Sequence, residues 1–204
     1  MTSKKLLLEF NAKKCSCAAI GPASKFKISD MILGQGTIDW SDTFKYLGVH
    51  FTAGTNLAVD LTVIKRKFYM SCNCILGNSR TMDDIVKLNL IESYCLPVLT
   101  YATEALRLTN SQLNDLNACW NSVYRRIFGF NRWESVRAFI SGLGRLDFKH
   151  LSILSQLKFC TARLANENAT YSFIMKRYYL SDFLNSCALV LGSVTLNTTG
   201  LLPF

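Results

Sequence analysis

The sequence predicts an α+β fold in which a short antiparallel β meander precedes a mainly α-helical bundle. Aromatic and β-branched residues alternate with glycine turns over the first fifty residues, as in short strands. From Thr55 onward the apolar residues recur every three or four positions, as on one face of a helix. Half of the 204 residues are hydrophobic, which is enough for a buried core without disulfide or metal support.

The strand region is predicted from short apolar runs separated by turns. Two such runs lie at residues 6–10 and 26–28. The Gly-Gln-Gly sequence at 34–36 is a turn signal. The segment 44–51 is rich in aromatic residues, and its Gly48 indicates a bulge or a close approach of another backbone. We therefore expect one antiparallel meander over residues 24–52.

The first two helices are predicted from apolar spacing and capping residues. Six apolar residues share one face of a helix that ends at Gly77, namely Leu57, Leu61, Ile64, Phe68, Cys72 and Ile75. Thr81 supplies a hydroxyl cap for the next helix, which runs from Ile85 to about Leu106. That helix is apolar almost all round and is expected to be central, with a kink at Pro97 because proline removes an amide donor.

Four more helices are predicted downstream. Thr109 caps the cleanest amphipathic segment of the chain, which Gly129 closes. Its apolar stripe consists of Leu113, Leu116, Trp120, Val123 and Ile127. A short helix is expected over 133–140, a longer one from its cap Asp147 to about Leu164, and a last one over 172–184.

The positive charge of the chain is concentrated in two blocks. The net charge is +9, of which residues 1–67 carry +5 and residues 121–163 carry +6, whereas 68–120 carry −2 and 164–204 are neutral. This pattern suits a polyanion lying across two elements of one fold. A solvated basic surface without a partner accounts for the charge equally well.

The second basic block interleaves arginines with aromatic residues. Its members are Arg125, Arg126, Phe128, Phe130, Arg132, Trp133, Arg137, Arg145 and Lys149. Arginines contact phosphates and aromatic rings pack on sugars or bases, a combination that grips nucleic acid without reading its sequence. The block is therefore a candidate nucleic-acid interface, although burial in the core is the favoured interpretation of the aromatic side chains.

Metal and thiol chemistry is disfavoured. Met82-Asp83-Asp84 has the carboxylate order of a polymerase metal site, but helix capping accounts for both aspartates. The eight cysteines are expected to be free thiols, because the Cys-x-Cys pairs are too closely spaced for usual zinc sites. No apolar run suffices for a membrane span or a signal peptide, so we expect an intracellular protein, cytoplasmic or nuclear and not secreted.

Several short segments of the sequence resemble motifs of one protein family. They occur in the same order as in that family, over roughly residues 6–160. They are Phe10–Cys15 (FNAKKC), Phe44–Val49 (FKYLGV), Ser93–Tyr101 (SYCLPVLTY), Cys119–Asn121 (CWN), Arg125–Phe130 (RRIFGF) and Arg132–Ser135 (RWES). They resemble the C-terminal part of the reverse transcriptases of LINE-type (non-LTR) retrotransposons, and FKYLGV is the most specific of them.

The resemblance implies a role for each part of the chain. Residues 1–54 correspond to the end of a palm, in which Lys14 of the Asn-x-x-Lys segment has been proposed to assist pyrophosphate departure. The hairpin that contains Phe44, Lys45, Tyr46, Leu47 and Gly48 resembles the primer grip. Residues 55–164 look like the thumb, which lies along the template-primer duplex, and 165–204 carry no match and are expected to be a helical or poorly ordered tail.

The implied site residues are thus nucleic-acid-binding, with none catalytic and none metal-ligating. They are Lys14, Phe44, Lys45, Tyr46, Leu47, Gly48, Arg125, Arg126, Arg132 and Arg137. The expected partner is an RNA/DNA or DNA duplex, bound independently of its sequence, and no membrane is expected.

The resemblance also implies what this chain lacks. In the family the catalytic aspartates stand upstream of the Asn-x-x-Lys segment, and this sequence starts only ten residues before it. We expect a fragment that does not polymerise DNA without the missing palm and fingers, and no cofactor, since Mg²⁺ belongs to a complete enzyme. A non-functional retroelement relic, or a helical module that docks a protein through the Leu113–Ile127 stripe, are the alternatives.

Overall fold

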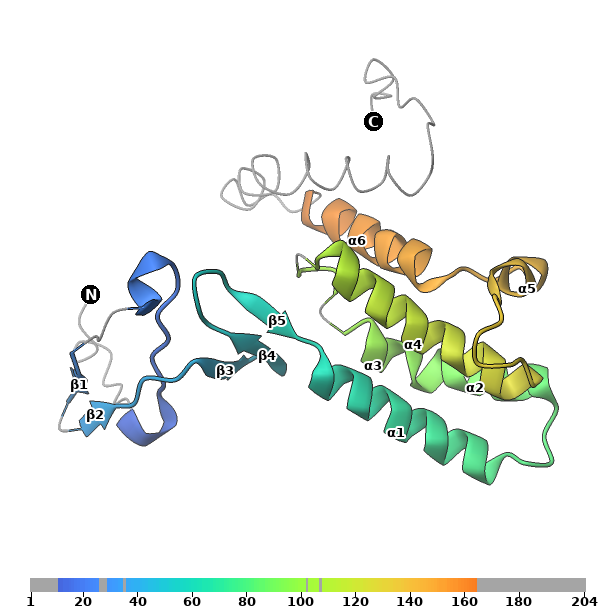
Figure 1. Cartoon of the computed structure of the whole chain (residues 1–204), viewed down its shortest axis with the longest axis horizontal. Coiled ribbons are helices and arrows are strands. Elements are labelled where there is room, and N and C mark those ends of the chain that lie inside the picture. The colour runs from blue at the N-terminus through green and yellow to red at the C-terminus, as the bar shows by residue number, and fades with distance from the viewer. Residues whose placement is uncertain (1–10, 26–28, 35, 102, 107, 165–204) are drawn as a thin grey trace, which may run out of the picture. The chain divides into compact units, whose positions relative to one another are not determined.

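A computed structural model describes five stretches of the chain (Figure 1). They are residues 11–25, 29–34, 36–101, 103–106 and 108–164. The chain divides into two compact units, Met1–Val63 and Ile64–Phe204. The fold is α+β, as predicted, with short antiparallel strands followed by helices. None of the helices in the described stretches is long and apolar enough to cross a membrane.

The first unit contains two small sheets instead of one meander. Its elements are η2 (Ala12–Lys14), η3 (Pro22–Lys25), β1 (Met31–Leu33), β2 (Gly36–Ile38), β3 (Thr43–Tyr46), β4 (Val49–Thr52) and β5 (Ala58–Asp60). Strands β1 and β2 form one antiparallel pair, and β3, β4 and β5 form a separate antiparallel sheet. The meander is interrupted because the backbones of Asp39 and Ser41 hydrogen-bond to Cys17 and not to the next strand. The predicted runs at 6–10 and 26–28 lie outside the described residues.

The predicted start of the first helix is wrong by seven residues. Residues 58–60 pair with β4, and Leu57 before them is 47% exposed, so the spacing of Leu57 and Leu61 matched a helix by coincidence. The helix begins at Thr62, whose backbone N–H donates to the carboxylate of Asp60 at 2.8 Å. A short polar side chain that accepts this bond offers the backbone a helix start there.

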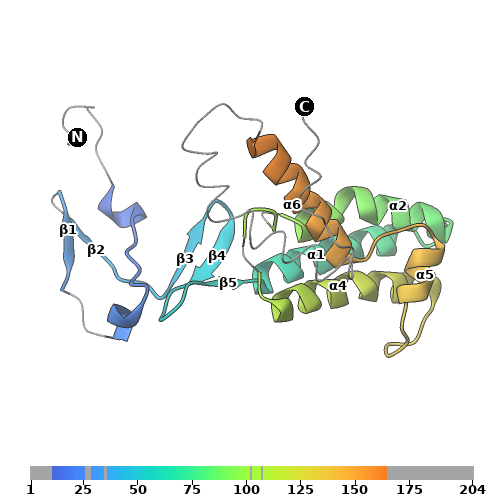
Figure 2. The same cartoon turned by 90° about the horizontal axis from the view of Figure 1, so that it is seen from above.

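Six helices follow. They are α1 (Thr62–Asn78), α2 (Asp84–Tyr94), α3 (Leu96–Leu99), α4 (Asn110–Phe128), α5 (Arg137–Gly142) and α6 (Phe148–Leu164). Helix α4 packs against both α2 and α6. Figures 1 and 2 show α1 and α4 running in one direction and α2 and α6 in the other. The predicted helix over 172–184 lies outside the described residues.

The core of the second unit centres on α4. Trp120 and Tyr124 of α4 and Phe68 of α1 are fully buried. The ring of Trp120 lies 6.4 Å from that of Phe68 and 5.5 Å from that of Tyr124, the second pair edge-to-face. Such aromatic pairs add to the free energy gained by burial. The predicted Leu113–Ile127 stripe is thus confirmed as a core face, with Leu116, Val123 and Ile127 also buried.

The predicted single helix over 85–106 is two helices. It breaks at Cys95, and Pro97 occupies the first turn of the short α3, where its missing N–H costs no hydrogen bond. Two other details differ from prediction. Asp83 caps α2 in place of Thr81, because its carboxylate accepts from the Ile85 backbone N–H at 2.8 Å. Helix α2 is also only partly central, since Leu88 and Ile91 are buried but Ile85, Val86 and Tyr94 are exposed.

The ends of α4 are as predicted. Thr109 and Gln112 form a capping box, in which each side chain bonds to the backbone of the other. Gly129 ends the helix with a φ of 70°, a left-handed conformation that favours glycine. The next helix begins four residues later than expected, at Arg137, because the backbone N–H of Glu134 bonds to Asn131 in a turn.

Helix α6 begins beside Asp147, as predicted. Burial alone would raise the pKa of Asp147, but hydrogen bonds from the backbone and ring of His150, with Arg137 nearby, hold it below the ordinary value of 3.8. A carboxyl whose pKa is lowered by folding stabilises the fold above its unfolded pKa, and this stabilisation is lost as the pH falls through the folded value.

We therefore expect the Asp147→Asn substitution to reduce the free energy of unfolding at pH 7 by about 0.5–1 kcal/mol, because the amide keeps the cap but loses the charge. The difference from the wild type should shrink as the pH falls below about 4. Urea unfolding of both proteins, followed by circular dichroism at several pH values, measures it. A difference that is the same at pH 7 and pH 3 contradicts the expectation.

Candidate nucleic-acid interface

The hairpin that the sequence singled out is formed by β3 and β4. Tyr46 pairs with Val49, so Leu47 and Gly48 are the two loop residues. Their φ angles are 47° and 84°, and positive values at both positions are those of a type I′ turn. Gly48 is therefore a residue of the turn between the strands, and the predicted bulge within a strand is wrong.

The predicted primer-grip residues do not share one surface. Successive strand residues face opposite sides of a sheet. Phe44 stacks on its cross-strand partner Phe51, with ring centroids 5.4 Å apart, and is half-buried. Tyr46 is on the same side and is 63% exposed, whereas Lys45 is on the other side, opposite His50. The exposed tip of the hairpin consists of Tyr46 and Leu47.

Leu47 is strained in this turn, because a leucine at positive φ costs of the order of 1 kcal/mol. The Leu47→Asn substitution creates the Asn-Gly pair that type I′ turns favour. We expect it to stabilise the hairpin, so that amide exchange of β4 slows roughly two- to fivefold. Hydrogen-exchange NMR measures this rate, and Leu47→Ala, which keeps the strained φ, is the control. Equal rates in both variants contradict the expectation.

Lys14 lies at the end of η2 and is exposed. It belongs to the first unit, as the hairpin does, but η2 packs against β2. A Cβ atom added to Gly36 of β2 would lie 2.7 Å from the Cβ of Ala12. The close approach of two backbones that was expected at Gly48 is therefore found at Gly36, where it holds the Asn-x-x-Lys segment.

Arg125 and Arg126 end α4 and have different roles. Successive helix residues point about 100° apart. The Nε of Arg125 donates to the carbonyl oxygen of Glu134 at 2.8 Å, and the carboxylate of Glu134 accepts from the backbone N–H of Asn131 at 2.6 Å. Arg125 is thus half-buried and fixes the loop after α4. Arg126 is exposed and faces the segment that joins α1 to α2.

Arg132 and Arg137 are exposed in that loop and at the start of α5. The guanidinium carbon of Arg132 lies 5.0 Å from the ring centroid of Trp133, a cation–π contact. In the part of the chain that the structure describes, no carboxylate lies within ion-pair distance of Arg126, Arg132 or Arg137. Arg126 and Arg132 are therefore available to a partner, and Arg137 is exposed as well, although its charge also acts on Asp147.

The aromatic residues of this block divide into two groups. Phe128 and Phe130 are half-buried, with ring centroids 4.7 and 5.0 Å from that of Phe139. They pack within the fold, as favoured from the sequence. Trp133 is 86% exposed, and the interpretation of it as a core residue is wrong. Its place in the loop between α4 and α5 leaves no helix face to bury it.

Arg145, also in this block, is used within the fold. Its guanidinium lies 3.3 Å from the carboxylate of Glu92 and donates to the side chain of Asn89 at 2.8 Å, which ties the loop before α6 to α2. Burial raises the pKa of Glu92, and Arg145 opposes this shift. Burial and the neighbouring Glu92 raise the pKa of Tyr124.

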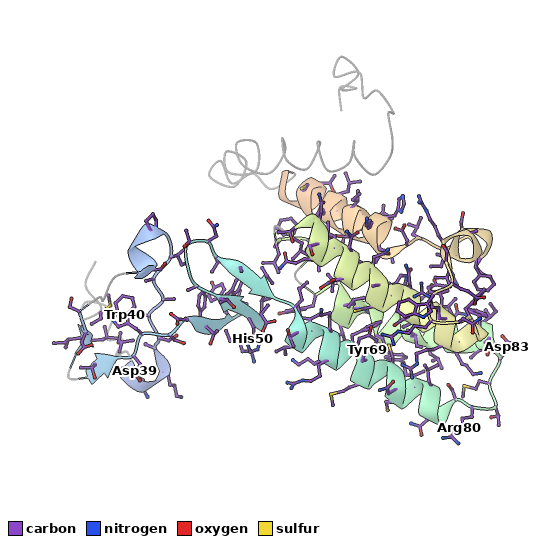
Figure 3. All side chains as sticks on the ribbon, viewed as in Figure 1. Asp39, Trp40, His50, Tyr69, Arg80 and Asp83 are labelled. Atoms are coloured by element: carbon purple, nitrogen blue, oxygen red, sulfur yellow. The ribbon has the colours of Figure 1, made fainter. Side chains whose placement is uncertain are left out.

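Two basic residues that the sequence did not single out lie beside Arg126. Arg80, Lys87 and Arg126 line a hollow of about 310 Å³ together with Leu76 and Ile127. Figure 3 shows Arg80 just beyond the end of α1 and Asp83 at the start of α2, at the same end of the helical unit. The sequence did not predict Arg80 and Lys87 as site residues. Their segment, 68–120, has a net negative charge, and both residues lie far from Arg126 along the chain.

The carboxylates and thiols considered from the sequence as metal ligands have other roles. The carboxylate of Asp84, next to the cap Asp83, pairs with Lys87 at 2.8 Å. Among the described residues, no three His, Cys, Asp or Glu side chains are placed to hold a metal ion. The seven described cysteines are free thiols, as predicted, and burial raises the pKa of Cys72.

The apolar stripe of α4 is not available to a partner. Leu116, Trp120 and Val123 are completely buried within the unit. The alternative of a helical module that docks a protein through this stripe therefore loses its surface.

No protein-family model, curated protein or solved structure matches the chain. The fold and the candidate site define an α+β protein with an arginine-rich surface at one end of a helical unit.

Proposed function

We propose that this chain binds an RNA/DNA or DNA duplex without reading its sequence, as the end of the palm and the thumb of a retrotransposon reverse transcriptase of the non-LTR type. Binding, and not phosphoryl transfer, is assigned to these residues. The protein acts in the cytoplasm or the nucleus, where such duplexes occur.

The observation that supports this proposal best is the set of three available guanidinium groups in and around one loop. Arg126, Arg132 and Arg137 are exposed and form no ion pair with a described carboxylate, although the charge of Arg137 also acts on Asp147. Guanidinium groups bind phosphates through two parallel hydrogen bonds. Base-independent binding of nucleic acid consists mainly of such contacts.

Trp133 supports the same conclusion. The Trp133 side chain is 86% exposed, so its ring is accessible to a partner. Arg132 holds its ring through the cation–π contact. Such a platform packs on a sugar or an end base while the guanidinium remains near a phosphate.

A titration of the full chain with fluorescently labelled duplexes tests the proposal. If the three arginines each meet one phosphate, affinity falls at least about 40-fold between 0.05 and 0.2 M salt. Two unrelated sequences should give the same affinity, since no base is read. If the chain binds no duplex at 0.05 M salt and none at 0.2 M salt, the proposal is contradicted.

A non-functional relic remains distinguishable from this proposal. An unpaired apolar strand edge is prone to aggregation. A relic should therefore aggregate or unfold without cooperativity, whereas a duplex-binding chain should unfold cooperatively at a temperature that the duplex raises.

A further inference from the structure

The hollow at the end of α1 brings together three positive charges from distant parts of the sequence. Arg80 follows α1, Lys87 lies in the second turn of α2, and Arg126 lies in the last turn of α4. Like charges that converge repel one another, and the cost is relieved when an anion enters. Two of the three, Arg80 and Arg126, have no carboxylate partner among the residues that the structure describes.

The remaining surfaces of the hollow suit a small anion. Leu76 and Ile127 form the apolar part of its lining, and the three cationic side chains form the rest. The volume of about 310 Å³ is at the lower end of the range for small-ligand pockets. Asp84 pairs with Lys87 at 2.8 Å and is the carboxylate that an incoming anion displaces.

We propose that this hollow is a phosphate-binding site, in which Arg80, Lys87 and Arg126 hold one phosphate group and Asp84 competes with it for Lys87. Two guanidinium forks and one ammonium group match the oxygens of a phosphate. The phosphate comes from the backbone of a duplex or from a free phosphate compound. Where it belongs to a duplex, the site rests on the proposed function and is the place where Arg126 makes its phosphate contact, with Arg80 and Lys87 beside it.

Two measurements on the full chain test the site. In the first, inorganic pyrophosphate is added during thermal unfolding, with sodium chloride of equal ionic strength as the blank. In the second, duplex affinity is measured against salt. The test variant is Arg80→Gln with Lys87→Gln. The matched control is Arg66→Gln with Lys67→Gln, which removes the same two charges from exposed positions on α1.

We expect the test variant to lose the pyrophosphate-dependent rise in Tm and to bind duplex about tenfold more weakly at 0.1 M salt, with a salt slope reduced by about 0.9, while the control keeps both. Asp84→Asn should bind more tightly than the wild type, because its competition for Lys87 is gone. A gain of affinity does not arise from misfolding. Asp84→Asn therefore tests the site even if the double variant Arg80→Gln, Lys87→Gln binds weakly only because it is misfolded.

The outcomes separate the site from the function. A loss in the duplex measurement that is specific to the test variant supports the site with a duplex phosphate. A loss confined to the pyrophosphate measurement supports the site with a free phosphate compound, and it does so even if the wild type binds no duplex and the proposed function fails. Equal losses in test and control variants, or no loss in either measurement, overturn the site.

Discussion

Replacement of Arg126, Arg132 and Arg137 by glutamine is expected to weaken duplex binding by roughly two to three orders of magnitude at 0.1 M salt. Each lost phosphate contact removes about 0.9 from the slope of log affinity against log salt, so the slope should fall by about 2.7. Arg125 is left unchanged because its Nε holds the carbonyl of Glu134, and its removal would disturb the loop itself. Fluorescence anisotropy at several salt concentrations measures both quantities.

The control for this variant has the same loss of charge at other positions. Arg66 and Lys67 of α1 and Lys158 of α6 are exposed, and their replacement by glutamine removes three positive charges. A change in binding of the same size in the control shows that net charge alone drives association. In that case the loop between α4 and α5 is not the contact surface.

The largest effect on stability is expected from Trp120→Ala. The side chain is fully buried between Phe68 and Tyr124, and truncation leaves a large cavity in the core. Such a change costs about 3–5 kcal/mol of unfolding free energy. Because domains are stable by only about 5–15 kcal/mol, this is a large share of the total. Urea unfolding followed by the helical circular dichroism signal measures the loss.

Two further tryptophan variants sharpen this measurement. Trp133→Ala removes the same side chain from an exposed position and should change stability by no more than about 0.5 kcal/mol. Trp120→Phe keeps much of the volume and removes a buried indole N–H that has no hydrogen-bond partner among the described groups, so it should cost less than Trp120→Ala. Similar losses for the two alanine variants would contradict the assigned core.

The helix that the sequence predicted best is α4, because its local signals agree with its burial. The capping box at Thr109 and the left-handed glycine at Gly129 mark its ends, and the stripe between them faces the core. The first helix was predicted too early because a run of the right spacing crosses into β5, where pairing with β4 outweighs the helical pattern. The pairing of β5 with β4 cannot be predicted from the local spacing of apolar residues.

The candidate site was only partly visible in the sequence. Interleaved arginine and aromatic residues located the segment, but the roles of its members depend on tertiary contacts. Arg125 and Arg145 are engaged in holding loops, whereas Arg132 is available and Trp133 is exposed. Lys45 and Tyr46 are neighbours in sequence but face opposite sides of the hairpin.

The sequence by itself determined the α+β class, the change from strands to helices, the caps of α4 and the position of the two basic blocks. These features depend on neighbouring residues, because propensity, capping and period are local properties. The tertiary structure alone decided that the strands form two sheets, that the stripe of α4 is enclosed, and that Arg80, Lys87 and Arg126 meet in one hollow. These residues converge because α1 and α4 end where α2 begins, and no local pattern encodes which helix ends will meet.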